Sequence, residues 1–129
     1  MPIFIPSHLL AVALGGALGA ALRFLTGASF LRLWPQAHFP WATLSVNLLG
    51  ALIIGYLTAY LGGRETSADW GRYFLITGIL GGFTTFSAFS LETATMLQRG
   101  EMLAALSYAA ASVIGTIALV FLGFYLGKS

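Results

Sequence analysis

The chain has 129 residues, of which 58% are hydrophobic and 8% charged, and its mean hydropathy is +0.89. This composition excludes an ordinary water-soluble domain and predicts an integral membrane protein. The formal net charge of +2 is dispersed and forms no basic cluster for nucleic acid, and the absence of cysteine excludes disulfide and thiolate chemistry.

Four long apolar segments follow one another along the chain, at about residues 8–30, 41–61, 70–97 and 102–126. Each is long enough to cross a hydrocarbon core of about 30 Å as a helix. The first segment has no positive charge before it, so it is interpreted as a span rather than a cleaved signal. We therefore expect residues 1–129 to form a single all-α membrane domain with short connections.

The first segment carries two features that stand out from its apolar background. Gly15 and Gly19 are four residues apart, which lets a second helix approach closely. Placing the charged side chain of Arg23 within a membrane span costs free energy. Two readings of it stay open: its side chain extends to the lipid headgroups, or it draws anions toward an aqueous vestibule.

The second segment contains a polar stripe, because Thr43, Asn47 and Gly50 recur at helical spacing. A buried amide in lipid must find partners. Asn47 therefore either bonds a neighbouring helix or lines a pathway for a ligand.

The third segment does not read as an uninterrupted helix. At about 28 residues it would measure roughly 42 Å as a straight helix, which exceeds the bilayer core. The segment therefore either tilts strongly or breaks. Glycines and β-branched threonines weaken helix propensity at residues 81–85, which gives a break its place within this run. Irregular backbone at membrane depth is tolerated only inside protein or beside a polar cavity, so this break marks a functional interior.

Aromatic and acidic residues follow the break. Phe86 and Phe89 lie three residues apart and share one helical face, and Ser87 supplies a hydroxyl nearby. Paired rings at this spacing serve either packing or a pathway. Glu92 has three open readings: a proton-coupling carboxylate, a partner of Arg23, or an interfacial residue.

The fourth segment repeats the polar stripe of the second. Tyr108, Ser112 and either Gly115 or Thr116 share one face of a helix rich in alanine and glycine. Small residues on the same face permit close helix packing.

Basic residues divide almost evenly between the two ends of the four-span arrangement. The end with the termini collects Arg64, Arg72 and Lys128, and the opposite end collects Arg32 and Arg99, with Arg23 nearby. The positive-inside rule then gives almost no preferred orientation. Four short helices also enclose little volume, so we expect two copies, and an antiparallel homodimer is compatible with this charge distribution.

Three motifs together resemble the Fluc (CrcB-type) fluoride channels over nearly the whole chain. They are GGALGAALRF at residues 15–24, TLSVNLLG at 43–50 and GGFTTFSAFSLE at 81–92. The family pattern usually has Gly at the position of Ala42 and commonly Thr at the position of Ala88.

The resemblance implies a fluoride-selective passive channel that exports fluoride from the cell and protects against its toxicity. It implies a dual-topology antiparallel homodimer in the inner (plasma) membrane, with two pores, a structural sodium ion at its centre and no organic cofactor. The backbone carbonyls of Gly81 and Thr84 would hold the sodium, and Arg23 would lie in a vestibule. The positions that match pore or anion-binding residues are Asn47, Phe86, Phe89, Thr43, Thr85, Ser87, Tyr108, Ser112 and Thr116.

The residue types suit this chemistry. Fluoride is small and strongly hydrated, so a selective path must replace its water with close hydrogen-bond donors in a narrow bore. Hydroxyls and an amide donate such bonds, and the positive edge of a phenylalanine ring offers a weaker contact.

Two other functions compete with this interpretation. A proton-coupled exporter of the small multidrug resistance type also uses four short spans, but it relies on an acid in the first span, where this chain has Arg23. A non-transporting membrane partner subunit would explain the glycine pairs but not the polar stripes. We expect no enzyme, since a nucleophile, base and orienting group do not occur at a recognisable spacing.

Overall fold

Seven helical segments build the fold in a computed structural model, which describes residues 6–62 and 68–128. Helix α1 spans Pro6–Leu33, α2 spans Trp41–Gly62 and α6 spans Met102–Gly127. The third apolar segment is divided into α3 (Ala68–Arg72), the π-helix η1 (Tyr73–Leu80), α4 (Gly81–Phe83) and α5 (Phe86–Gln98). Arg64, which entered the charge count above, lies outside the described residues.

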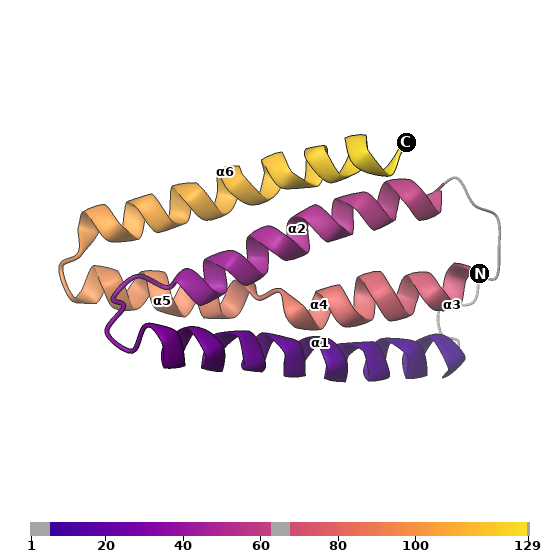
Figure 1. The fold of residues 1–129 in the computed structure, drawn as a ribbon, viewed down its shortest axis with the longest axis horizontal. Coiled ribbons are helices and arrows are strands. Elements are labelled where there is room, and N and C mark those ends of the chain that lie inside the picture. The colour runs from indigo at the N-terminus through magenta and orange to yellow at the C-terminus, as the bar shows by residue number, and fades with distance from the viewer. Residues whose placement is uncertain (1–5, 63–67, 129) are drawn as a thin grey trace.

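Four helical stretches are long and apolar enough to cross a membrane: Pro6–Leu33, Trp41–Gly62, Trp70–Gln98 and Met102–Gly127. The predicted all-α class with a broken third helix is thereby confirmed. In Figure 1 the start of α1 and the end of α6 lie at one end of the bundle, and the α1–α2 and α5–α6 connections lie at the other. Helix α6 packs along α2, and α1 packs along η1 and α4.

Glycines on α1 allow its close approach to the third segment. A Cβ atom built on Gly15 would collide with the carbonyl oxygen of Phe74, and one on Gly19 would collide with that of Ile79. On the facing segment, a Cβ on Gly82 would lie 2.5 Å from the carbonyl oxygen of Gly16. The predicted role of Gly15 and Gly19 in close helix packing is confirmed.

The helix break lies within the predicted run, but its glycines are not where the backbone leaves the helix. Gly81 has helical angles (φ −63°, ψ −36°), whereas Thr84 (φ −82°, ψ 158°) and Thr85 (φ −152°, ψ 122°) are extended. The break predicted within residues 81–85 is therefore confirmed, and it is confined to the two threonines of that run. Gly82 is needed for contact with α1, and the β-branched threonines tolerate the extended conformation well.

The π-helix η1 was not predicted from the sequence. Its eight residues, Tyr73–Leu80, directly precede α4. Wide helical turns of this kind are rare in proteins overall, and those that occur are often found at functional sites.

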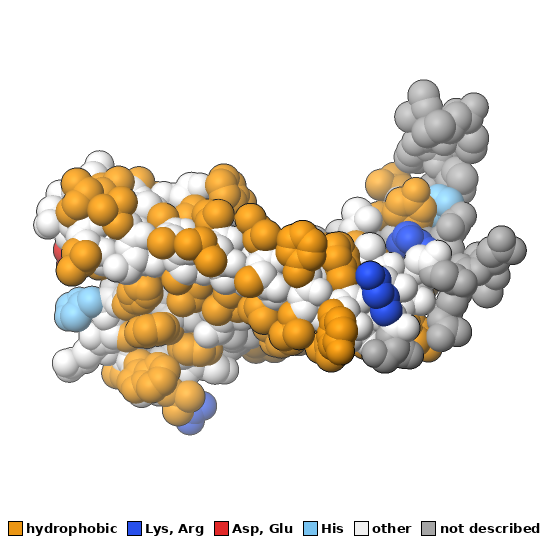
Figure 2. All heavy atoms as spheres, turned by 90° about the horizontal axis from the view of Figure 1, so that it is seen from above, with side chains coloured by type: hydrophobic (Ala, Val, Ile, Leu, Met, Phe, Trp, Pro, Cys, Tyr) orange, Lys and Arg blue, Asp and Glu red, His pale blue; other side chains and the backbone are white. Residues whose placement is uncertain are grey.

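Large apolar side chains are exposed along much of the molecule. Figure 2 shows them across the middle of one face. Large exposed residues recur along α1 and α6, for example Leu18 (51%), Phe24 (73%), Ile114 (69%) and Phe121 (65%). The buried cluster is small and consists of Leu44, Met96, Ala105 and Tyr108. This distribution fits a lipid environment, in which the outer surface is as apolar as the interior.

Candidate functional site

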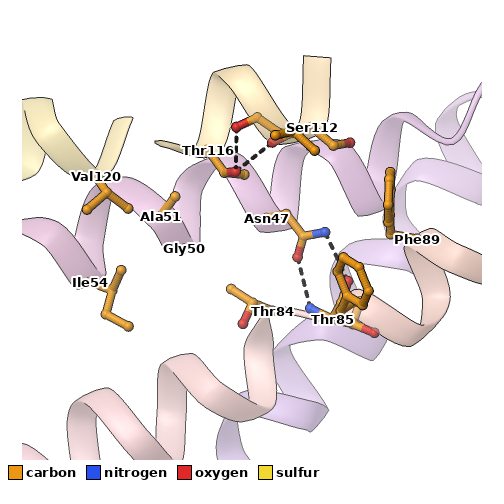
Figure 3. A pocket seen from close by; sticks show the side chains of 12 residues that line it. Asn47, Gly50, Ala51, Ile54, Thr84, Thr85, Phe89, Ser112, Thr116 and Val120 are labelled. Carbon is orange, nitrogen blue, oxygen red and sulfur yellow. Dashed lines mark hydrogen bonds between the residues drawn. The ribbon is translucent and has the colours of Figure 1, made fainter. Parts of the chain in front are cut away.

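A groove of about 300 Å³ opens beside the helix break, between α2, the third segment and α6 (Figure 3). Six of the predicted pore residues and Thr84 line it. The six predicted pore residues are Asn47, Thr85, Phe86, Phe89, Ser112 and Thr116. The apolar residues Ala51, Ile54, Val113 and Val120 also line the groove. The structure thus brings together side chains from three helices that lie far apart in the sequence.

Asn47 bonds to the extended backbone of the break. Its Oδ1 accepts a hydrogen bond from the Thr85 N–H at 2.9 Å, and its Nδ2 donates to the Thr85 carbonyl at 3.0 Å (Figure 3). These two bonds determine the orientation of the amide. Since an amide NH₂ group carries two donors, one N–H of Asn47 is left for another acceptor.

Ser112 presents a hydroxyl with spare capacity to the same groove. The residue is 6% exposed, and its Oγ has no hydrogen-bond partner among the residues that the structure describes. A buried, unpaired hydroxyl costs free energy, so it marks a position where an acceptor fits. Thr116 differs, because its Oγ1 donates to the Ser112 carbonyl at 2.5 Å, which occupies its proton.

Two phenylalanine rings form one side of the groove. The ring centroids of Phe86 and Phe89 lie 5.5 Å apart, with their planes inclined at 40°. Phe89 is partly buried against Tyr108, at a centroid distance of 5.1 Å. The side chain of Phe86 is a large apolar ring, yet it is 77% exposed.

A second cavity, of about 420 Å³, lies on the other side of Thr85. Its lining includes Arg23, Thr43 and Thr85, together with Ala42 and Ala88, the two positions where the chain departs from the family pattern. Thr85 lines both cavities, so it forms part of the wall between them. Arg23 reaches the break itself, because its Nε donates to the Gly82 carbonyl at 3.1 Å.

A partly buried carboxylate, which the predicted site did not include, joins two of its residues. Glu92 accepts hydrogen bonds from the Thr43 hydroxyl at 2.8 Å and from the Tyr108 hydroxyl at 2.7 Å. Tyr108 is fully buried, so it lies behind Phe89 rather than on the groove wall. An acid within an apolar segment was the available signal, but its partners on α2 and α6 could not be derived from spacing.

Two further predicted residues are exposed on the third segment. Ser87 and Gly81 are exposed, as is Phe86, and the Ser87 Oγ lies 3.3 Å from the Thr85 Oγ1. The predicted site residues therefore occupy the groove, the cavity with Arg23, exposed positions on the third segment and, for Tyr108, a buried position beside Glu92.

Several carbonyls at the break lose their usual helical partners, among them those of Gly81 and Thr84. In a continuous helix the Thr85 N–H would bond the Gly81 carbonyl, and the Ala88 N–H would bond the Thr84 carbonyl. Here the Thr85 N–H donates to Asn47, and the Ala88 N–H donates to the Thr85 Oγ1 at 3.1 Å. Backbone oxygens of this kind are suitable ligands for a hard cation. Among the described residues no cluster of His, Cys, Asp and Glu offers an alternative metal site.

Residues 10–124 match the family described as CrcB-like protein, Camphor Resistance (CrcB). A protein from Mesorhizobium japonicum named fluoride-specific ion channel FluC is 48% identical over 122 residues, covering 95% of this chain and 97% of the relative. A protein of the same name from Chelativorans sp. is 46% identical over 122 residues, with coverage of 95% and 97%. Another from Bordetella petrii is 48% identical over 120 residues, with coverage of 92% and 90%.

Proposed function

The chain belongs to the CrcB-like family, and we propose that it forms a passive, fluoride-selective channel through which a cell loses accumulated fluoride. It is a multi-pass membrane protein, which in bacteria means the inner membrane, and it is an ion channel rather than an enzyme. The groove at the helix break is the proposed path of the anion.

The observation that carries this proposal is the Ser112 hydroxyl inside the groove, for which the described part of the chain supplies no hydrogen-bond partner. Together with the spare N–H of Asn47, it offers donors that replace the hydration shell of a small anion. A larger halide gains less from short hydrogen bonds, so this arrangement favours fluoride. The edges of Phe86 and Phe89 supply the positive rim of the ring quadrupole along the same wall.

Arg23 raises the local anion concentration before the groove is entered. Its Nε is held by the Gly82 carbonyl, which leaves the other guanidinium N–H groups for the cavity that it lines. A fixed cation at the wall of a vestibule attracts anions without binding them so tightly that release is slow.

The channel is a homodimer, because one copy leaves the helix break open on one side. Gly81, Phe86 and Ser87 are exposed beside a broken helix, and unsatisfied backbone in contact with lipid is costly. A second copy that covers this face closes both grooves and gives two pores. An antiparallel arrangement agrees with the balanced charges: Arg72 and Lys128 lie at one end of the bundle, and Arg32 and Arg99 at the other.

We also propose that a sodium ion is bound at the centre of this dimer. The Gly81 and Thr84 carbonyls have lost their helical N–H partners, and Gly81 lies on the face that the second copy covers. Four carbonyl oxygens, two from each copy, would then surround the ion. Sodium contributes a fixed charge that holds the two breaks together, and no charged side chain is required.

Electrogenic efflux from liposomes tests the proposal. Vesicles loaded with potassium fluoride should release fluoride rapidly once valinomycin supplies a potassium path, and slowly without it. A proton-coupled exporter would instead release fluoride without valinomycin when a pH gradient is imposed, and this result would contradict passive conduction. Reaction of cysteines introduced at one loop from both sides of the membrane checks the antiparallel arrangement.

A further inference from the structure

We propose that Asn47 and Thr85 are positioning residues whose side chains keep the Gly81 and Thr84 carbonyls free to bind a cation. The inference rests on the sodium site proposed above. It assigns to two residues of the anion path a second role, on the backbone rather than on the permeating ion.

The Thr85 side chain acts on the Thr84 carbonyl. Its Oγ1 caps α5 by accepting a hydrogen bond from the Ala88 N–H at 3.1 Å. The Ala88 N–H is the donor that a continuous helix would direct to the Thr84 carbonyl. Without the hydroxyl oxygen this N–H has no acceptor, and closing the helical ladder onto Thr84 becomes favourable. The cap therefore leaves the Thr84 carbonyl free to bind a cation.

The Asn47 side chain acts in the same way on the Gly81 carbonyl. It takes the Thr85 N–H, which a continuous helix would direct to Gly81, and it also bonds the Thr85 carbonyl. The Asn47 amide bonds both the N–H and the carbonyl of Thr85, as a residue of a neighbouring β-strand would do. Thr85 has the extended backbone angles that such pairing requires. In Figure 3 the Asn47 side chain extends from α2 across to this residue.

Arg23 distinguishes the Gly82 carbonyl from that of Gly81. The Gly82 carbonyl lies next to that of Gly81, but it accepts a hydrogen bond from the Arg23 Nε. A side chain therefore engages Gly82, whereas the side-chain bonds of Asn47 and Thr85 remove N–H donors from Gly81 and Thr84. Three side chains from α1, α2 and the break itself thus act on the carbonyls of Gly81, Gly82 and Thr84.

Thermal unfolding of the purified full-length protein at a series of sodium concentrations tests this inference, with N-methylglucamine as the replacement cation. Thr85→Val removes the acceptor at nearly constant volume, whereas Thr85→Ser retains it. We expect the sodium concentration that gives half of the stabilisation to rise about tenfold in Thr85→Val, as for one lost hydrogen bond of ordinary strength, and to stay near the wild-type value in Thr85→Ser. Asn47→Leu should cause a similar rise.

Ser87→Ala is the matched control, because it removes a neighbouring hydroxyl that lies 3.3 Å from the Thr85 Oγ1 and caps no backbone N–H in the described hydrogen bonds. Its sodium response should equal that of the wild type. An unchanged sodium midpoint in both Thr85→Val and Asn47→Leu would overturn the positioning role while leaving the sodium site intact. If sodium fails to stabilise the wild type, both the sodium site and this inference are wrong, and fluoride conduction remains testable by flux. Should Thr85→Val not fold, Asn47→Leu carries the same comparison.

Discussion

Replacing Phe86 by isoleucine should reduce fluoride flux while leaving the chain folded. The ring is 77% exposed, so the chain itself covers only about a quarter of it. A fully buried phenylalanine covers about 200 Å², so the covered part is about 50 Å². The coefficient for transfer from water gives about 1 kcal/mol for this area, which is an upper bound in lipid. Isoleucine retains much of this area, and the free energy of unfolding should therefore change by well under about 1 kcal/mol.

The effect on conduction should be larger, because the proposed contact between the ring edge and the anion is made where water has been removed. If the lost edge contact is worth about 1.5 kcal/mol in the barrier, flux should fall about tenfold. Efflux from liposomes at equal protein density measures the fall, and size-exclusion chromatography and thermal unfolding measure the fold. Phe121→Ile is the matched control, since Phe121 is 65% exposed on α6 and does not line the groove. Wild-type flux in Phe86→Ile, or an equal loss in Phe121→Ile, would refute the role of the ring edge.

Three further predictions concern the groove, the buried carboxylate and the helix contacts. Ser112→Ala should lower fluoride flux yet leave the unfolding temperature unchanged or higher, because it removes a buried hydroxyl that has no partner among the described residues; a lower unfolding temperature would contradict this. Tyr108→Phe removes one of two donors to Glu92 and should reduce the free energy of unfolding by about 1.5–3 kcal/mol in denaturant titrations, and an unchanged midpoint would count against it. Gly19→Ala should sharply lower the yield of folded protein in size-exclusion chromatography, whereas Gly27→Ala on the same helix, where a Cβ meets nothing within 4 Å, should not; equal yields would refute the packing argument.

The four helices and the close packing of α1 could be predicted from the sequence because both depend on local patterns. Apolar runs of sufficient length report spans directly, and the spacing of Gly15 and Gly19 places them on one face. The region of the break was also predictable, since residues 81–85 weaken helix propensity. Which residues of that region leave the helix was not, because contact with α1 keeps the glycines helical.

The partners of the polar residues depended on the tertiary arrangement and could not be derived from spacing. Three readings of Glu92 stood open, and the structure gives it Thr43 and Tyr108 as donors. Arg23, considered as its partner, instead bonds the Gly82 carbonyl. Asn47 was expected either to bond a neighbouring helix or to line a pathway, and the structure shows that it bonds the third segment while also lining the groove. Helical periodicity places a residue on a face, but the rotation and tilt of neighbouring helices decide what that face meets.

A direct comparison of fluoride and chloride efflux from the same liposomes tests the central claim that this groove conducts fluoride selectively. Vesicles with equal loads of the two anions, valinomycin present, should lose fluoride rapidly while chloride loss stays at the rate of protein-free vesicles. Fluoride and chloride efflux at similar rates would contradict the claim, because donors and ring edges in a narrow path cannot then be what selects the ion.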